Sequence, residues 1–204
     1  MNIALALDNQ IVAASADAAI LNRITADDTQ LTIWHRPLPV TLAWVDTLEW
    51  NRIDDLDFPA PVDALDAEIA EGLEEAGYPR DERGVALRDE IATLARRFAA
   101  IIDCETVKLR LEVVQTDACR KFHADAVTAR LLTTLSGPGT QWIETAVPDR
   151  ISQLAAGDVA IFKGRLWVEE PVILHRSPPI AGTPDTRLLL VIDPFDPVKE
   201  AAHD

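Results

Sequence analysis

Val107-Lys108-Leu109-Arg110-Leu111-Glu112-Val113-Val114 alternates apolar and polar side chains up to Val113. Because successive side chains of a β-strand point to opposite faces, this period of two predicts a strand with one buried face. Turns rich in glycine and proline, such as Ser136-Gly137-Pro138-Gly139, separate further short apolar segments. These segments predict strands over residues 126–135, 140–143, 159–163, 166–168, 172–175 and 187–192. Such a series of short strands is typical of a β-sandwich or a jelly roll.

The first hundred residues follow a different pattern, in which apolar residues recur every three or four positions. This spacing predicts helices over residues 41–57, 62–76 and 84–100, and one strand over residues 31–36. The stretch Phe58-Pro59-Ala60-Pro61 is expected to end the first helix. We therefore predict an α+β fold in a single domain, residues 1–204. A jelly roll (double-stranded β-helix) over residues 101–198 would be buttressed by the helix-rich part, residues 1–100.

The composition disfavours several classes of function. With 48% hydrophobic residues the chain is not disordered, and no apolar run approaches the ~18–20 residues of a membrane-spanning helix. The net charge of -15 disfavours binding to nucleic-acid phosphates and to anionic membranes. The first residues have no basic region typical of a secretion signal, and the two cysteines make no disulfide framework. We expect a cytoplasmic protein that binds neither nucleic acid nor membrane.

The stretch Phe122-His123-Ala124-Asp125 carries the strongest functional signal. On a strand, His123 and Asp125 point to the same face, about 7 Å apart at ~3.3 Å per residue, so both can reach one ion. His175, expected on a later strand, supplies a second imidazole. Two imidazoles and one carboxylate leave three octahedral positions open, as in non-haem Fe(II) oxygenases. In the alternative, the histidines bind nothing and the chain is a structural or interaction domain.

Arg187 opens the apolar segment Arg187-Leu188-Leu189-Leu190-Val191-Ile192. The period of two places its side chain on the face of Leu189 and Val191, where an unpaired charge is costly to bury. The carboxylate of a bound keto acid, held by two guanidinium nitrogens, would compensate this charge. In the alternative, Arg187 forms an ion pair with an acidic residue of the chain: Asp158, Asp185 or Asp193.

Cys119 and Trp142 complete the set of candidate residues. If the strand extends back from His123, Cys119 shares its face, and a thiolate beside two imidazoles favours Zn(II) in a closed tetrahedral site. In the alternative, Cys119 is a small buried apolar residue. Trp142 follows a glycine-rich turn and is expected to line a pocket near His123.

Several linked motifs occur in one order along the chain. They are Cys119-Arg120-Lys121-Phe122-His123-Ala124-Asp125, Arg130-Leu131-Leu132-Thr133-Thr134, Gly137-Pro138-Gly139-Thr140-Gln141-Trp142, Gly157-Asp158-Val159-Ala160, Lys163-Gly164, His175-Arg176-Ser177-Pro178 and Arg187-Leu188-Leu189-Leu190. Together they resemble the bacterial domain of unknown function family 1826, over about residues 100–195.

The same order of motifs resembles, more weakly, the 2-oxoglutarate oxygenase superfamily and its prolyl-hydroxylase-like branch. The resemblance implies four functional residues: the Fe(II) ligands His123, Asp125 and His175, and the 2-oxoglutarate ligand Arg187. Many members have a serine two residues after this arginine, where this chain has Leu189. Thr133 or Thr134 would then supply the hydroxyl group that binds the cosubstrate.

We therefore expect an Fe(II)- and 2-oxoglutarate-dependent oxygenase that acts on an unidentified small molecule or protein. The alternative from a different class is a non-catalytic zinc-binding or metal-handling protein, with Cys119 as an extra ligand. Neither the substrate nor the oligomeric state follows from the sequence.

Overall fold

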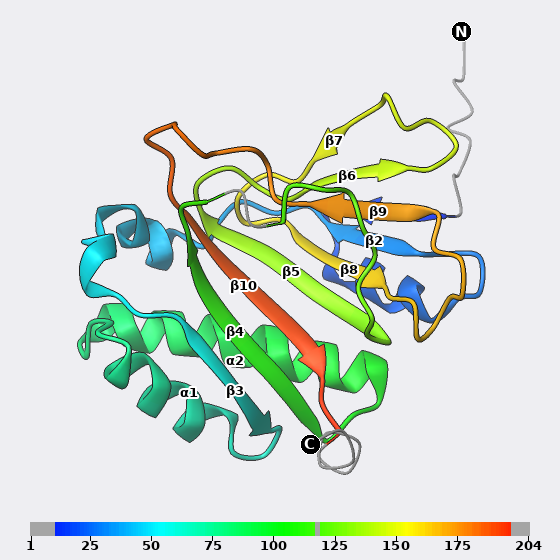
Figure 1. Cartoon of the computed structure of the whole chain (residues 1–204). Coiled ribbons are helices and arrows are strands. Elements are labelled where there is room, and N and C mark those ends of the chain that lie inside the picture. Colours follow the sequence, from blue (N-terminus) through cyan, green and yellow to red (C-terminus); the bar gives the residue numbers. More distant parts are fainter. Residues whose placement is uncertain (1–10, 117–118, 197–204) are drawn as a thin grey trace, which may run out of the picture.

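The computed structural model describes residues 11–116 and 119–196, which form a mixed α+β fold. Seven strands form a large sheet with the spatial order β1-β2-β8-β5-β10-β4-β3 (Figure 1). Neighbouring strands in it are antiparallel, except that β1 and β2 are parallel. The strands are β1 (Val12–Ser15), β2 (Leu31–Trp34), β3 (Leu56–Pro61), β4 (Thr106–Val114), β5 (Ala129–Ser136), β8 (Val159–Lys163) and β10 (Arg187–Pro194).

A smaller sheet of three strands lies against one face of the large sheet. Its order is β7-β6-β9, and its strands are β6 (Gln141–Glu144), β7 (Ser152–Gln153) and β9 (Ile173–Arg176). Side chains of both sheets meet in one apolar cluster, which includes Ile33, Leu132, Ala160, Phe162, Ile173, Leu189 and Val191. This cluster forms the inner core, next to which the candidate site lies.

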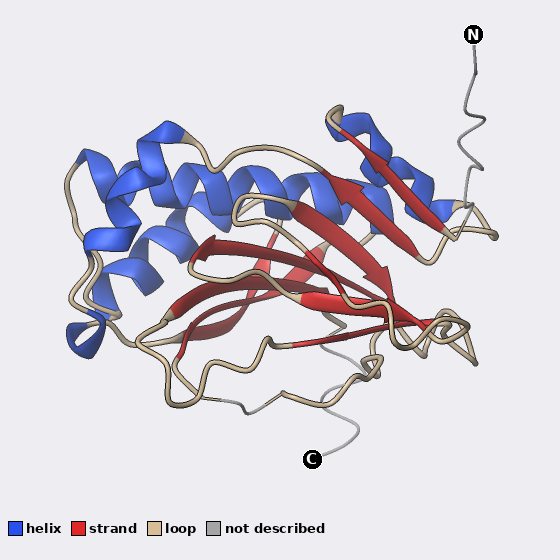
Figure 2. Cartoon of the chain, turned by 90° about the horizontal axis from the view of Figure 1, so that it is seen from above, coloured by secondary structure: helices blue, strands red, loops and turns tan. Residues whose placement is uncertain are grey.

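Helices cover the opposite face of the large sheet (Figure 2). They are the α-helices α1 (Leu65–Glu75) and α2 (Glu82–Ile102) and the 3₁₀ helices η1 (Ala18–Thr25), η2 (Val40–Thr47) and η3 (Trp50–Arg52). The Asp81 side chain caps α2 by accepting a hydrogen bond from Arg83 N. Apolar residues of α2 pack in a second core with residues of β4 and β10, including Leu87, Ile91, Phe98, Leu109, Leu188 and Leu190.

Most segments predicted from periodicity are confirmed. The helices expected over residues 62–76 and 84–100 are α1 and α2. The strands expected from the alternation of apolar residues are β2, β4, β5, β6, β8, β9 and β10, with ends that differ by a few residues. These segments carry enough apolar residues on one face to bury it, which is why the local pattern was sufficient.

The helix expected over residues 41–57 is wrong. The chain forms η2 and η3 there and then enters β3, an edge strand of the large sheet that contains the stretch 58–61. Val62 N donates to Glu105 O at 2.9 Å, so the alternate amide positions, which the two prolines of β3 occupy, face away from β4. Proline is tolerated in such a strand because its missing N–H faces outward.

The strand expected over residues 166–168 is also wrong. This segment is a turn in which Trp167 N and Val168 N both donate to Gly164 O at 3.0 Å. The elements η1, β1 and β7 were not predicted, and the last of these has only two residues. Pairing with a neighbouring strand, rather than a local sequence pattern, stabilises β1 and β7.

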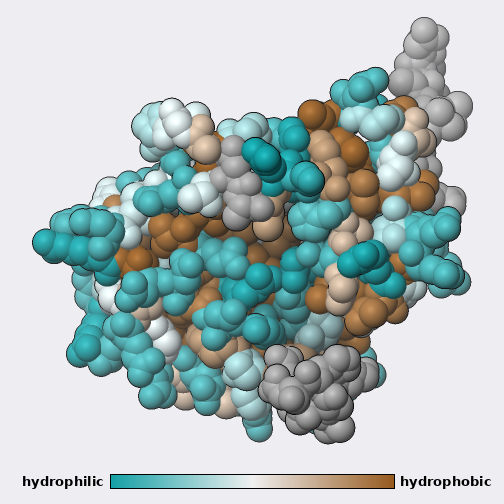
Figure 3. Space-filling model, viewed as in Figure 1, coloured by the Kyte–Doolittle hydropathy of each residue, from teal (hydrophilic) through white to brown (hydrophobic). Residues whose placement is uncertain are grey.

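The surface of the protein is mixed in character. On the face shown in Figure 3, hydrophilic side chains lie over most of the molecule, with apolar side chains between them. Within residues 11–116 and 119–196, no helix combines the length and the apolar character that crossing a membrane requires.

Candidate metal centre

His123 and His175 lie next to each other at the edge of the smaller sheet. His175 belongs to β9, and His123 extends this sheet by an isolated antiparallel bridge to His175. Each backbone N–H donates to the other residue's carbonyl, at 3.0 Å and 2.9 Å, and the two ring centroids are 4.8 Å apart. The second imidazole therefore arrives from a later strand, as the sequence predicted.

Asp125 faces both imidazoles. Its Oδ2 is 3.0 Å from His175 Nε2, and its Oδ1 is 3.6 Å from His123 Nε2. One potential ligand atom from each of the three residues lies within 4.8 Å of the others. The prediction that His123 and Asp125 share a strand is wrong, because the chain leaves the sheet after the single bridge at His123. The two side chains converge nevertheless.

The backbone around Asp125 is fixed by the turn that follows β8. Arg165 N donates to Asp125 O at 2.9 Å, and Gly164 N donates to Thr128 O at 2.8 Å. A Cβ atom at Gly164 would lie only 2.0 Å from Val127 O and 3.0 Å from Asp125 O. This close approach of two backbones requires glycine at position 164.

The protonation states of the three residues suit a cation site. His123 Nδ1 lies 2.8 Å from Lys121 O, so the ring donates its proton there and leaves the Nε2 lone pair towards Asp125. Asp125 raises the pKa of His123, whereas burial lowers the pKa of His175. Burial acts to raise the pKa of Asp125, but His123, His175 and Arg130 together hold it below its ordinary value. The carboxylate is therefore ionised at neutral pH.

An unsatisfied oxygen tests whether these residues fit a metal ion. Asp125 Oδ2 is buried, and despite its distance of 3.0 Å from His175 Nε2 it lacks the geometry of a hydrogen bond. A buried acceptor without a hydrogen bond is costly, unless its lone pair serves another partner. A carboxylate with two imidazoles is a donor set for a first-row transition metal, so the residues fit such an ion.

Arg130 is a contact of the site that the sequence did not reveal. It lies on β5, and its Nη1 is 2.6 Å from Asp125 Oδ1. Its Nε and Nη2 both donate to the carboxylate of Asp193 on β10, at 2.7 Å. A charged residue inside a strand that is otherwise buried was the available signal.

Arg187 is fully buried, and no carboxylate of the described residues forms an ion pair with it. The expected acidic alternatives have other partners: His35 for Asp158, Thr183 for Asp185, and Arg110 and Arg130 for Asp193. The guanidinium donates instead to three hydroxyl groups, those of Ser177 (2.9 Å), Thr140 (3.1 Å) and Thr134 (3.4 Å). Its Nε has no hydrogen-bond partner.

Burial lowers the pKa of Arg187 to about 10, against the charges of Glu112 and Cys119, which act to raise it. Arg187 is thus still a cation at neutral pH. Hydroxyl oxygens accept its hydrogen bonds without neutralising its charge. The side chain is therefore a buried cation that a ligand anion would compensate.

The proposed hydroxyl group at Thr133 does not lie beside Arg187. Thr133 is flanked on β5 by Leu131 and Leu135, both of which pack into the helix-facing core. Because side chains alternate along a strand, Thr133 faces the helices and Thr134 faces the smaller sheet. The contact with Arg187 is made by Thr134, which the sequence had offered as the second choice.

Cys119 is exposed and is not one of the three residues whose ligand atoms converge. It lines an open pocket of about 310 Å³ together with Arg120, Lys121 and His123. The expectation that Cys119 is a buried apolar residue is therefore wrong as well. The pocket gives His123 access to solvent.

Trp142 lies directly opposite His175 in the antiparallel pairing of β6 and β9. It is half-buried and packs against the inner core. The ring of Phe162, from β8, lies 4.7 Å from that of His175. The His175 ring thus lies against the Phe162 ring as well as beside that of His123.

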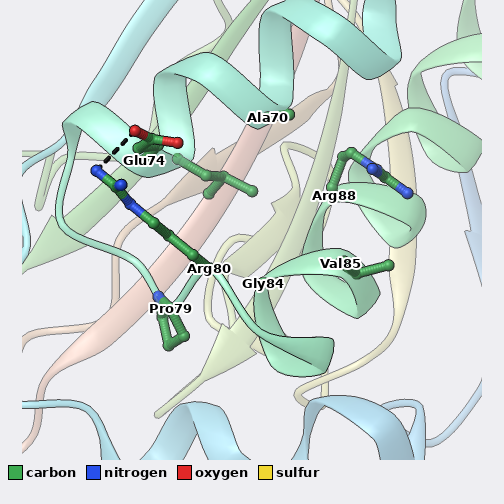
Figure 4. Close-up of a pocket in the computed structure, with 8 residues that line it drawn as sticks. Ala70, Glu74, Pro79, Arg80, Gly84, Val85 and Arg88 are labelled. Carbon is green, nitrogen blue, oxygen red and sulfur yellow. Dashed lines mark ion pairs between the residues drawn. The ribbon is translucent and has the colours of Figure 1, made fainter.

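A second pocket, of about 170 Å³, lies between α1 and α2 (Figure 4). Its lining residues are Ala70, Leu73, Glu74, Pro79, Arg80, Gly84, Val85 and Arg88. Arg80 forms an ion pair with Glu74 there, at 2.6 Å. The lining contains no histidine or cysteine, so this pocket offers no comparable ligand set.

The sequence model of the family described as Protein of unknown function (DUF1826) matches residues 15–193 of the chain. No curated protein matches the chain significantly.

Several solved structures are similar to this one at low sequence identity. The dioxygenase for auxin oxidation 1 from Arabidopsis thaliana, in its binary complex with 2-oxoglutarate, is 12% identical, with a TM-score of 0.46 over 78% of this chain and 73% of that chain. A full-length protein from Neurospora crassa, in complex with alpha-KG, is 11% identical, with a TM-score of 0.43 over 80% and 73%. A bsmA homolog from Methylobium petroleophilum PM1 is 13% identical, with a TM-score of 0.48 over 86% and 91%.

Proposed function

This chain belongs to the family described as Protein of unknown function (DUF1826), and we propose that it is an Fe(II)- and 2-oxoglutarate-dependent oxygenase. The family membership confirms the resemblance predicted from the sequence motifs. The observation that carries the proposal is the convergence of His123, Asp125 and His175 around an unsatisfied carboxylate oxygen.

The winding of the strands supports a double-stranded β-helix, which is the finer fold of this proposal. Successive segments from β4 onward alternate between the two sheets. The large sheet takes β4, β5, β8 and β10, and the smaller sheet takes the bridge at His123, then β6 and β7, and then β9. Two facing sheets between which consecutive strands alternate in this way are characteristic of jelly rolls.

In the proposed centre, His123, His175 and Asp125 would hold the metal ion. The hydrogen bond from His123 Nδ1 to Lys121 O orients the first ring, and Phe162 packs against the second. When bound there with 2-oxoglutarate, Fe(II) would supply the chemistry that couples oxidative decarboxylation of the keto acid to oxidation of a substrate. The open pocket at His123 is the proposed route of entry for the substrate.

Arg187 is the proposed ligand of the 2-oxoglutarate carboxylate. The hydroxyl groups of Ser177, Thr134 and Thr140 hold its guanidinium and leave Nε without a partner. Ser177 lies two residues after His175, so this contact links the buried cation to the strand that carries a proposed metal ligand. Leu189 stands where many oxygenases have a serine, and the Thr134 hydroxyl takes that place in this proposal.

Both cysteines are free thiols. Free thiols fit a reducing compartment, so we propose a cytoplasmic location. The pocket lining includes Arg120 and Lys121, so a substrate that carries a negative charge is compatible with it.

The test uses the full chain, purified without a histidine tag and reconstituted with Fe(II) under anaerobic conditions. We expect one equivalent of iron per chain and a visible metal-to-ligand charge-transfer band on addition of 2-oxoglutarate. His175→Ala should abolish both signals, whereas His35→Ala, at a histidine paired with Asp158 far along the chain, should retain them. Wild-type protein that binds iron but gives no band would contradict the 2-oxoglutarate assignment, and protein that binds no iron would contradict the whole proposal.

A further inference from the structure

Arg130 divides the Asp125 carboxylate into two unequal oxygens. Its Nη1 lies 2.6 Å from Oδ1, whereas Oδ2 faces His175 Nε2 at 3.0 Å and has no hydrogen bond. We propose that Arg130 is a positioning residue, which holds Oδ1 so that Oδ2 alone is presented to the metal ion. This inference rests on the proposed metal centre, and it concerns how the third ligand is oriented.

The orientation matters because a free carboxylate can rotate. A carboxylate binds a cation through one oxygen or through both, and binding through both would occupy a further coordination position. With Oδ1 held by a guanidinium nitrogen, Asp125 is restricted to one oxygen. The coordination position that the second oxygen would otherwise occupy remains available for the cosubstrate or O₂.

Asp193 prevents Arg130 from neutralising Asp125. A guanidinium beside a ligand carboxylate repels a cation, and it would weaken the site if Asp125 were its sole partner. The Asp193 carboxylate binds Nε and Nη2 of Arg130 bidentately, both at 2.7 Å. The charge of Arg130 is therefore balanced from the opposite side, and Asp125 keeps its negative charge for the metal.

The arrangement is rigid because it spans the large sheet. Arg130 lies on β5 and Asp193 on β10, which is the neighbouring strand. Arg110, on β4, lies on the other side of β10, and its Nη2 donates to Asp193 Oδ2 at 3.3 Å. Arg110 forms no ion pair with Asp125 among the described residues. Arg110 is therefore a matched control for Arg130: it has the same charge and the same acidic partner, without the ligand.

The experiment measures the affinity of the full-length protein for Co(II), by competition with a chelator, and the visible d–d spectrum of the complex. Arg130→Gln should weaken Co(II) binding about 10- to 100-fold, the usual effect of removing a partner of a metal ligand. It should also change the spectrum, because the released carboxylate can bind through both oxygens. Arg110→Gln should leave the affinity within about threefold and the spectrum unchanged. Arg130→Lys, which restores a cation next to Oδ1, should recover part of the affinity and the wild-type spectrum.

The possible results distinguish the positioning role from the metal centre itself. Folded Arg130→Gln protein with wild-type affinity and spectrum would overturn the positioning role alone, as would an equal loss in Arg110→Gln. Wild-type protein that binds no Co(II) would overturn the metal centre, and this inference with it. If Arg130→Gln does not fold, Arg130→Lys decides: a partial loss of Co(II) affinity supports the positioning role, and an unchanged affinity overturns it.

Discussion

His123 and His175 form a hydrogen-bonded pair of an antiparallel ladder, because each donates its backbone N–H to the other's carbonyl. The distance between the two imidazoles is thus set by the backbone and not by side-chain packing alone. On its other side, His175 pairs with Trp142 of β6. The strand that carries His175 is therefore held from both sides, whereas Asp125, beyond the bridge, is held by the turn that follows β8.

We predict that Gly164→Ala disturbs the site through the backbone of Asp125. The new methyl group would meet Val127 O at 2.0 Å and Asp125 O at 3.0 Å. The overpacking should lower the free energy of unfolding by about 1–3 kcal/mol and weaken Co(II) binding. Gly182→Ala is the control: its φ of +81° makes the substitution strained, but no atom lies within 4 Å of the new Cβ. Its Co(II) affinity should equal that of wild type, and equal affinities in both variants would refute the prediction.

A second prediction contrasts Arg187, which is fully buried, with Arg130, which is partly buried. Arg187 has hydroxyl groups and no carboxylate as partners among the described residues, so Arg187→Met removes an uncompensated buried charge. We expect the free energy of unfolding to stay equal or rise, by about 0–4 kcal/mol, while 2-oxoglutarate binding is lost. Arg130→Met removes the guanidinium that both carboxylates share, so that Asp193 keeps Arg110 and Asp125 keeps its two histidines. It should therefore lower the free energy of unfolding, but by less than the ~3–5 kcal/mol of a fully uncompensated buried charge.

Chemical denaturation of the metal-free proteins measures both values, and the charge-transfer band measures binding of the keto acid. Arg187→Met protein that is clearly less stable than wild type would mean that a group of the chain already compensates this charge.

Metal affinity should depend on pH through His123. Asp125 raises the pKa of His123 above its ordinary value of 6.5, and a metal ion must displace this proton. Affinity should therefore fall about tenfold per pH unit below the pKa of His123, and level off above it. Burial lowers the pKa of His175, so this residue is already neutral in that range.

The stability of the metal-free protein should change in the opposite direction. A raised pKa means that the His123–Asp125 interaction stabilises the fold fully below pH 6.5 and is lost as the pH rises through the folded-state value. The increase in Tm on addition of Co(II) should therefore grow from about pH 6 to about pH 8. A shift that does not change with pH would indicate that no proton is displaced from His123.

Cys119→Ala separates the iron and zinc interpretations. In the proposed centre Cys119 is not a ligand, because it is exposed and lies outside the converging triad. We expect this variant to retain the Co(II) affinity of wild type within about threefold. Neither the variant nor the wild-type protein should show a sulfur-to-metal charge-transfer band. Cys104→Ala serves as the thiol control. A loss of about 100-fold in Cys119→Ala alone would favour the zinc-binding alternative.

Much of the fold followed from the sequence because β4, β5 and β10 are long enough to show their own period. The strand β3 could not be predicted in this way, since proline is expected both at the end of a helix and in an edge strand. Only its pairing with β4, which lies far along the chain, distinguishes these cases. Local pattern contains no information about that partner.

The sequence predicted that His123, Asp125 and His175 lie close together, and they do, although not through a strand that His123 and Asp125 share. His123 and Asp125 converge without a shared strand, because the bridge to His175 holds the first and the turn after β8 holds the second. The choice between Thr133 and Thr134 depends on which face of β5 meets the helices, and two adjacent threonines do not reveal it. The position of Arg130 inside a buried strand marked it as unusual, but its partners did not follow from the sequence, since they depend on the register of β5 with β10.

The outward-facing prolines of β3 have a consequence for self-association. An exposed sheet edge recruits other polypeptides by offering a regular row of amide donors, and Pro59 and Pro61 interrupt this row at alternate positions. A second molecule that paired along β3 would therefore lack the two backbone hydrogen bonds that these positions would otherwise donate. The two residues that made this strand resemble the end of a helix thus also disfavour its use as a template for edge-to-edge association.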